Sequence, residues 1–205
     1  MDSGFPPFDP NGPGPEGDES RGPRLRDISM RMMVPNIITA LAICAGMTGI
    51  RLAFEGRFEL AVVMVLLAAF LDAIDGRAAR LLKSTSKFGA QMDSLADIVN
   101  FGVAPALVLY AYLLDQVKSF GWIAAMIYAI AVGLRLARFN VMQEDGVRAS
   151  WQADYFVGIP APGGAVLLLL PVYIGFIGVE PGLTLAYLAL AYTVLIAFLM
   201  VSRVP

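Results

Sequence analysis

The chain has 205 residues, of which 58% are hydrophobic and only 16% are charged, and its mean hydropathy is +0.68. Soluble domains are about 45–50% apolar and about 25% charged, so this composition argues against a soluble enzyme and predicts a membrane protein with several spans. The absence of His and the single Cys, Cys44, exclude a His-based triad, a His metal site, an intrachain disulfide and a four-cysteine zinc site. Acid–base or metal chemistry is left to the 17 Asp and Glu residues, and a net charge of −2 gives no reason to expect nucleic acid.

Residues 1–30 differ from the rest of the chain, because six of the 13 prolines and five glycines lie there. Such a segment cannot bury enough apolar surface to offset the entropy lost on ordering. We therefore predict a disordered cytoplasmic tail over 1–30 and a transmembrane domain over 31–205.

Six apolar stretches fit the roughly 20 residues that a membrane-spanning helix needs. They are 34–54, 60–82, 88–114, 120–140, 160–178 and 182–201, and they predict an all-α integral membrane bundle. With the N-terminus inside, 12 Lys and Arg residues lie on the inner side, and Arg51, Arg57 and Lys118 lie on the outer side. Because inner loops carry the excess of basic residues, both termini are expected in the cytoplasm.

The second and third predicted spans carry charges that an ordinary span lacks. Asp72 and Asp75 lie in the second half of one span, and Asp93 and Asp97 lie in the first half of the next. The linker 83–87 is short, so the two helices form an antiparallel hairpin, and Asp72 and Asp97 reach depths of about 15 Å and 13.5 Å below the cytoplasmic surface. Spacings of three and four residues put each pair on one helix face, so the four carboxylates can converge.

Charges at this depth predict a polar cavity, because each costs roughly 2.5–3.5 kcal/mol at the bilayer centre on insertion scales. Two hard divalent cations, Mg²⁺ or Mn²⁺, would offset the repulsion between four carboxylates, since both ions favour carboxylate oxygens. Gly76, Ala79 and Gly89 lie beside the aspartates and would leave room for a bulky polar ligand, although close packing between helices is the alternative explanation.

Together these residues form one pattern, Asp72-x2-Asp75-Gly76-x2-Ala79-Arg80-x8-Gly89-x3-Asp93-x3-Asp97. The pattern resembles the signature of the CDP-alcohol phosphotransferases, with every position filled. Four flanking segments are similar to the phosphatidylserine synthase branch, the CDP-diacylglycerol–serine O-phosphatidyltransferases: 86–97, 100–105, 135–140 and 156–162. The resemblance covers about Met32 to Pro171. Members of this branch often have two further helices after the sixth, so we expect that the chain is truncated after Pro205.

The resemblance implies a six-helix catalytic domain in the cell (inner) membrane, a homodimer, two divalent cations and an active site on the cytoplasmic side. It implies transfer of the phosphatidyl group from CDP-diacylglycerol to the hydroxyl of L-serine, which gives phosphatidylserine and CMP. By the same resemblance, the metal ligands are Asp72, Asp75, Asp93 and Asp97, and Asp97 is also the general base.

Two further groups of residues are predicted to bind the substrates. The nucleotide and donor group comprises Asn36, Thr39, Asp72, Gly76, Ala79, Arg80, Ser86 and Gly89. The acceptor group comprises Lys87, Arg135, Arg138 and Asn140, because Arg suits bidentate recognition of a carboxylate or phosphate. Ordinary structural roles remain open, such as helix caps for Asn36 and Thr39 and snorkelling for the two α-helical arginines. Arg80 could also serve only to neutralise the aspartates.

Two alternatives differ from serine transfer. The acceptor could be glycerol 3-phosphate or inositol phosphate, but phosphorylated acceptors would need more cationic groups than the inner loops offer. The remote alternative is a divalent-cation transporter, because intramembrane carboxylates also mark ion pathways. The charges stop at mid-depth on one side, however, and only Arg51 and Arg57 lie near the outer edge, whereas transport needs access from both sides.

Overall fold

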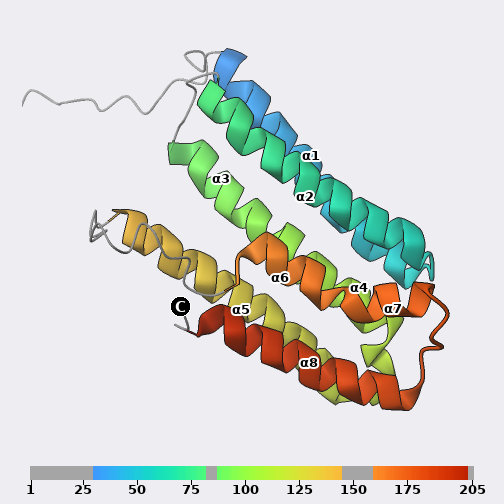
Figure 1. Cartoon of the computed structure of the whole chain (residues 1–205). Helices are drawn as coiled ribbons and strands as arrows, with labels where there is room; N and C mark the ends of the chain where they lie inside the picture. Colours follow the sequence, from blue (N-terminus) through green and yellow to red (C-terminus); the bar gives the residue numbers. More distant parts are fainter. Residues whose placement is uncertain (1–29, 82–86, 145–158, 203–205) are drawn as a thin grey trace, which may run out of the picture.

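The computed structural model describes residues 30–81, 87–144 and 159–202, which form one elongated helical bundle (Figure 1). Within these ranges there is no strand, and the predicted all-α fold is confirmed. The helices are α1 (Met30–Phe54), α2 (Phe58–Leu81), α3 (Lys87–Asp97), η2 (Ile98–Val103), α4 (Ala104–Tyr112), η3 (Leu114–Val117), α5 (Lys118–Glu144), α6 (Ala161–Leu168), α7 (Leu170–Phe176) and α8 (Leu183–Val201). The predicted tail, apart from Met30, lies outside the described residues.

The six predicted spans coincide with six helical units. Four units are single helices, while α3 continues through η2 into α4, and α6 continues into α7. Four segments are long and apolar enough to cross a membrane by length and composition: Met33–Phe54, Phe88–Tyr112, Leu114–Met142 and Leu183–Val201. The unit Ala161–Phe176 is apolar but shorter. The unit formed by α2 is of similar length but carries charges in its second half.

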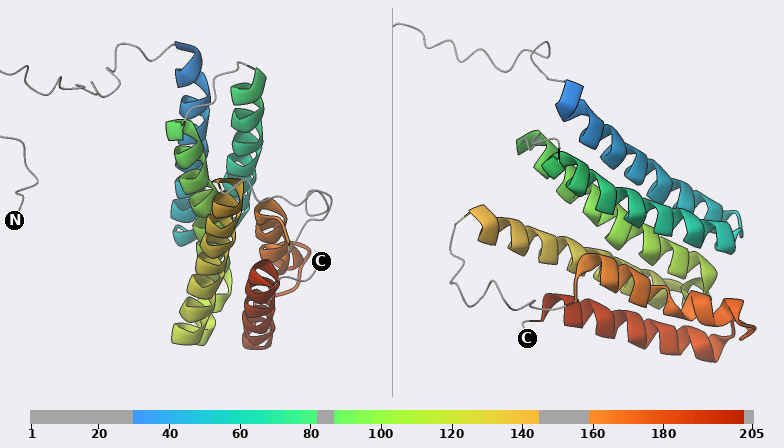
Figure 2. Two further views of the ribbon diagram at one scale, coloured as in Figure 1. Left: turned by 90° about the vertical axis from the view of Figure 1, so that its left-hand side faces the viewer. Right: turned by 45° about the horizontal axis from the view of Figure 1, so that its top comes forward.

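The bundle is built from two helix pairs with a third unit between them. α1 and α2 run antiparallel side by side, and α5 and α8 form the second pair (Figure 1). The α3–η2–α4 unit contacts helices of both pairs, as the two views in Figure 2 also show. The buried core lies where α4, α5, α6 and α8 meet, around Leu109, Tyr128, Leu168 and Met200. Large apolar side chains such as Phe198 are exposed on the outer faces, as a lipid-facing bundle requires.

A π-helix, η2, interrupts the third unit, which the sequence alone predicts as one continuous helix. The N–H of Ala104 bonds to the carbonyl of Val99, five residues earlier. Pro105 has no N–H, so it cannot satisfy the carbonyl of Phe101. The hydroxyl of Tyr128 on α5 donates to that carbonyl instead, at 3.0 Å. The proline and its distant tyrosine partner thus hold a wide helical turn next to the aspartates, and such turns are frequent at functional sites.

The end of the bundle formed by the α1–α2 turn is closed by aromatic side chains. Tyr112 packs edge-on against Phe58, with ring centroids 5.0 Å apart, and against Phe176, at 6.2 Å. A glycine, Gly175, lies directly against the Tyr112 hydroxyl and leaves space for it. We call this region the turn end.

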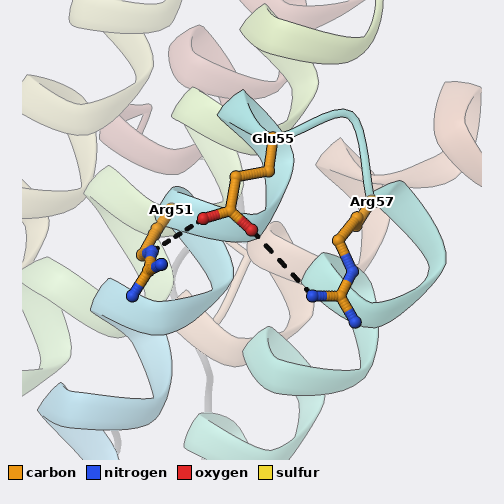
Figure 3. Close-up of polar contacts among 3 residues, drawn as sticks. All are labelled: Arg51, Glu55 and Arg57. Carbon is orange, nitrogen blue, oxygen red and sulfur yellow. Dashed lines mark hydrogen bonds and ion pairs between the residues drawn. The ribbon is translucent and has the colours of Figure 1, made fainter.

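Charges at the turn end pair with one another. Glu55 accepts a hydrogen bond from Arg51 Nε at 2.8 Å, and its second oxygen lies 4.0 Å from Arg57 Nη1 (Figure 3). All three residues are exposed. The two arginines that the sequence places near the outer edge therefore share one acidic partner at the surface.

Candidate functional site

The second half of α2 and the first half of α3 bring acidic side chains together at the opposite end of the bundle. Asp72, Asp75 and Asp93 each place one carboxylate oxygen within 4.8 Å of the others. The carboxyl of Asp97 lies against that of Asp72 and close to those of Asp75 and Asp93. We call these four residues the carboxylate site.

The local folding of the chain explains this convergence. α2 ends at Leu81 and α3 begins at Lys87, so the two helices run in opposite directions from one end of the bundle (Figure 1). Residues three or four apart lie on one helix face. The paired aspartates of each helix therefore face the other helix at similar depth. Asp75 is the most buried of them, with only 2% of its surface exposed.

The donor set fits hard divalent cations. The carboxylate oxygens Asp72 Oδ1 and Asp75 Oδ1 are buried and have no hydrogen-bond partner among the described residues. Burying an ionised carboxylate is costly unless it is paired or binds a metal. The three clustered residues offer only oxygen atoms, which Mg²⁺ and Mn²⁺ prefer. The burial, the missing partners and the ligand chemistry therefore all point to cation binding.

The hydroxyl of Thr39 on α1 contacts one of these carboxylates, that of Asp75. Its hydroxyl lies 2.6 Å from Asp75 Oδ2 and 3.0 Å from the carbonyl of Pro35, and its side chain is 4% exposed. The resemblance predicts a nucleotide contact for Thr39, whereas in the structure its hydroxyl is directed at a predicted metal ligand. Asn36, predicted with it, lies one turn earlier on α1 and is half-buried.

The predicted donor-binding residues of α2 and α3 differ in their surroundings. A Cβ added at Gly76 would meet no atom of the described residues within 4 Å, so this position faces open space in the described part of the chain. Arg80 is exposed and its Nε donates to the carbonyl of Gly76 at 3.0 Å, so it folds back onto its own helix. Gly89 lies one turn before Asp93 and is half-buried. Ala79 lies near the end of α2, and Ser86 lies outside the described residues.

The predicted acceptor-binding residues occupy different surroundings. Arg135 on α5 is half-buried and interacts electrostatically with Asp97 and Arg138. Its Nε is buried and has no hydrogen-bond partner among the described residues. Arg138 Nη1 donates to the carbonyl of Val201 at the end of α8, at 3.4 Å. Asn140 Nδ2 donates to the Ser94 hydroxyl at 3.0 Å and so joins α5 to α3. Of these three, Arg135 is the one that interacts electrostatically with one of the four aspartates, Asp97. Lys87 is the first residue of α3.

The structure adds one residue for which the sequence predicts no role. Asn100 lies on η2, is fully buried, and sits beside the Asp72 carboxyl. Asp93, Asp97 and Asn100 follow each other at intervals of four and three residues, which is the spacing of one helix face. That spacing is the signal that could have identified Asn100.

Comparison with known proteins adds independent information. Residues 32–201 match the family model of the CDP-alcohol phosphatidyltransferases. A CDP-diacylglycerol–serine O-phosphatidyltransferase of Mycobacterium leprae is 47% identical over 147 residues, which are 72% of this chain and 49% of that protein. The Helicobacter pylori protein of the same name is 41% identical over 138 residues, 67% of this chain and 56% of its own length.

A shorter relative is covered more fully. The Bacillus subtilis protein of the same name is 33% identical over 137 residues, which are 67% of this chain and 73% of that protein. The chain spans about half the length of the mycobacterial relatives that it matches. Because the family model covers most of the chain and the carboxylate site lies within the matched residues, the chain belongs to the CDP-alcohol phosphatidyltransferase family.

Proposed function

We propose that the chain catalyses transfer of the phosphatidyl group from CDP-diacylglycerol to the hydroxyl of L-serine, giving phosphatidylserine and CMP. The observation that carries this proposal is the carboxylate site, in a chain similar to several proteins that bear the name of this activity. The proposal includes the homodimer, the cell membrane as location, and a site on the cytoplasmic side, which follow from the resemblance and the distribution of basic residues.

The carboxylates would have two tasks. Asp72, Asp75, Asp93 and Asp97 would hold two divalent cations, Mg²⁺ or Mn²⁺, which when bound screen the pyrophosphate and stabilise the leaving CMP. The serine oxygen forms a bond to the phosphorus that carries the diacylglycerol, and the bond from that phosphorus to the CMP oxygen breaks. The proton of the serine hydroxyl goes to a carboxylate, because the chain has no His to accept it, and the family resemblance assigns this role to Asp97.

Substrate binding would use the space and charge around the aspartates. The open position at Gly76 lets the nucleotide approach the backbone of α2. Arg135 has a buried Nε near Asp97 without a partner among the described residues, which supports a role for its guanidinium in binding the serine carboxylate. A single guanidinium of this kind suits an amino acid better than an acceptor with its own phosphate.

The test is an acceptor series with the purified chain in detergent. CMP release would be measured with CDP-diacylglycerol and Mn²⁺, with L-serine, glycerol 3-phosphate, inositol phosphate or no acceptor. We expect release that depends on L-serine and is lost in Asp97→Asn, while Glu55→Gln at the turn end keeps it.

The other outcomes are equally informative. Release with a phosphorylated acceptor only would keep the family chemistry and overturn serine as the acceptor. No release with any acceptor, from a folded sample that binds Mn²⁺, would contradict the proposed activity.

A further inference from the structure

Asn100 is the most deeply buried polar side chain near the carboxylate site. None of its surface is exposed, and neither Nδ2 nor Oδ1 has a hydrogen-bond partner among the described residues. An amide in such a position normally has partners, because leaving a buried polar group unsatisfied costs stability. A buried Asn without hydrogen-bond partners therefore indicates a role other than packing.

The surroundings of the amide limit what that role is. Oδ1 faces α1 at Gly46, where an added Cβ would come within 2.6 Å of it. The amide also lies beside the carboxyl of Asp72, whose Oδ1 is itself buried with no hydrogen-bond partner in the described segments. A carboxylate only accepts hydrogen bonds, and of the two amide atoms only Nδ2 donates. The amide is therefore oriented with Nδ2 toward Asp72 and Oδ1 toward α1.

The backbone holds this side chain in place. Asn100 belongs to η2, which Tyr128 anchors to α5 through the carbonyl of Phe101. Gly102, on the same turn, packs closely against Val132 of α5, since an added Cβ would lie 3.3 Å from the Val132 Cβ. The π-helical turn that carries Asn100 is therefore anchored to α5 by a hydrogen bond and by close packing.

We propose that Asn100 is a positioning residue of the carboxylate site: when a cation occupies the site, its Nδ2 donates a hydrogen bond to Asp72 and so fixes which oxygen of that carboxylate faces the cation. Gly46 is the residue of α1 that leaves the amide its space. The proposal rests on the proposed function, because it assigns Asn100 to the site that would hold the ions. Groups that orient metal ligands in this way commonly change metal affinity by roughly 10–100-fold when they are removed.

The experiment compares Mn²⁺ binding and thermal stability of the full chain in detergent. Mn²⁺ affinity would be measured by electron paramagnetic resonance, and the Tm would be measured in the presence of a chelator. In Asn100→Leu we expect the Kd for Mn²⁺ to rise by roughly 10–100-fold. We expect the Tm in chelator to stay the same or rise, because an unsatisfied buried amide is replaced by an apolar group of similar size.

A matched control separates positioning from packing. Thr193 on α8 is 1% exposed and donates to the carbonyl of Ala189 at 2.7 Å, far along the chain from the aspartates. Thr193→Val should lower the Tm and leave the Mn²⁺ Kd unchanged. If Asn100→Leu behaves like Thr193→Val, with a lower Tm and an unchanged Kd, the positioning role is wrong.

A second variant tests the geometry even if Asn100→Leu folds poorly. Gly46→Ala pushes on the amide from α1 and should also weaken Mn²⁺ binding. In an Asn100→Ala background the clash is gone, so Gly46→Ala should add nothing to the Kd. Additive effects would overturn the proposed contact. If the unaltered chain itself binds no Mn²⁺, the proposed metal site fails, which is a different outcome from unchanged binding in the Asn100 variants.

Discussion

The charged side chains at the two ends of the bundle have opposite surroundings. At the turn end, one exposed carboxylate, Glu55, lies between two exposed arginines (Figure 3). At the other end, four aspartates gather, and two of their oxygens are buried without a partner in the described part of the chain. Exposed ion pairs stabilise a protein by about 0–1 kcal/mol, whereas buried unpaired carboxylates oppose folding. The carboxylate site therefore lowers the stability of the fold unless a cation binds there, and sites of this kind are often functional.

Three glycines, Gly121, Gly175 and Gly76, show a second difference between the two ends. At the turn end, a Cβ on Gly121 would collide with the backbone carbonyl of Leu114, and one on Gly175 would collide with Tyr112. At the carboxylate site, a Cβ on Gly76 would meet none of the described residues within 4 Å. Gly121 and Gly175 thus permit close packing at the turn end, whereas Gly76 leaves open space at the carboxylate site. This contrast predicts where substitutions will affect folding and where they will affect activity.

The largest effect is expected for Asp97→Asn. This change keeps the shape of the side chain and removes the proposed base, so CMP release should fall by about 10²–10⁴-fold. The assay is CMP release with L-serine and CDP-diacylglycerol. Removing a carboxylate from the turn end with Glu55→Gln is the control. Equal losses of CMP release in both variants would mean that the loss follows from removing a negative charge, whatever its position in the bundle.

A smaller loss is expected for Thr39→Val, which removes the hydroxyl next to Asp75. Because the hydroxyl orients a proposed metal ligand, Mn²⁺ binding should weaken by roughly 10–100-fold. Thr39→Ser keeps the hydroxyl and should retain most of the affinity. If Thr39→Val binds Mn²⁺ normally but has a higher KM for CDP-diacylglycerol, Thr39 contacts the nucleotide instead.

A pair of glycine substitutions sharpens the contrast in packing. Gly121→Ala should lower the free energy of unfolding by about 1–3 kcal/mol, because the Leu114 backbone cannot yield easily. Gly76→Ala should leave stability unchanged or raise it by up to about 1 kcal/mol, since Ala is the better helix former. Gly76→Ala should nevertheless raise the KM for CDP-diacylglycerol. The measurements are the Tm in detergent and steady-state kinetics, and a reversed pattern would contradict the assigned roles of the two ends.

The smallest effect is expected for the ion pairs of the turn end. Glu55→Gln should change the free energy of unfolding by less than about 1 kcal/mol, because all three charged residues are exposed. The difference from the unaltered chain should shrink further at high salt. Thermal unfolding at two salt concentrations measures it, and a large salt-independent loss would show that the pair is part of the packed structure.

The helices and the carboxylate site follow from local sequence patterns. Apolar runs of sufficient length give the six units, and the spacing of the aspartates on two adjacent helices brings them together. The rest depends on partners that are distant in the sequence. The π-helical turn at Pro105 is completed by Tyr128, and the space for Asn100 is left by Gly46. Arg80 bonds to its own helix, which its position in the motif does not indicate.

The central claim is that the carboxylate site carries out a cation-dependent transfer to serine. The most direct measurement is CMP release from CDP-diacylglycerol by the unaltered chain, first in a chelator and then after Mn²⁺ is restored. We predict release only when both L-serine and the cation are present. Serine-dependent CMP release that continues in the chelator would contradict this claim, because the transfer would then not depend on cations bound by the four carboxylates.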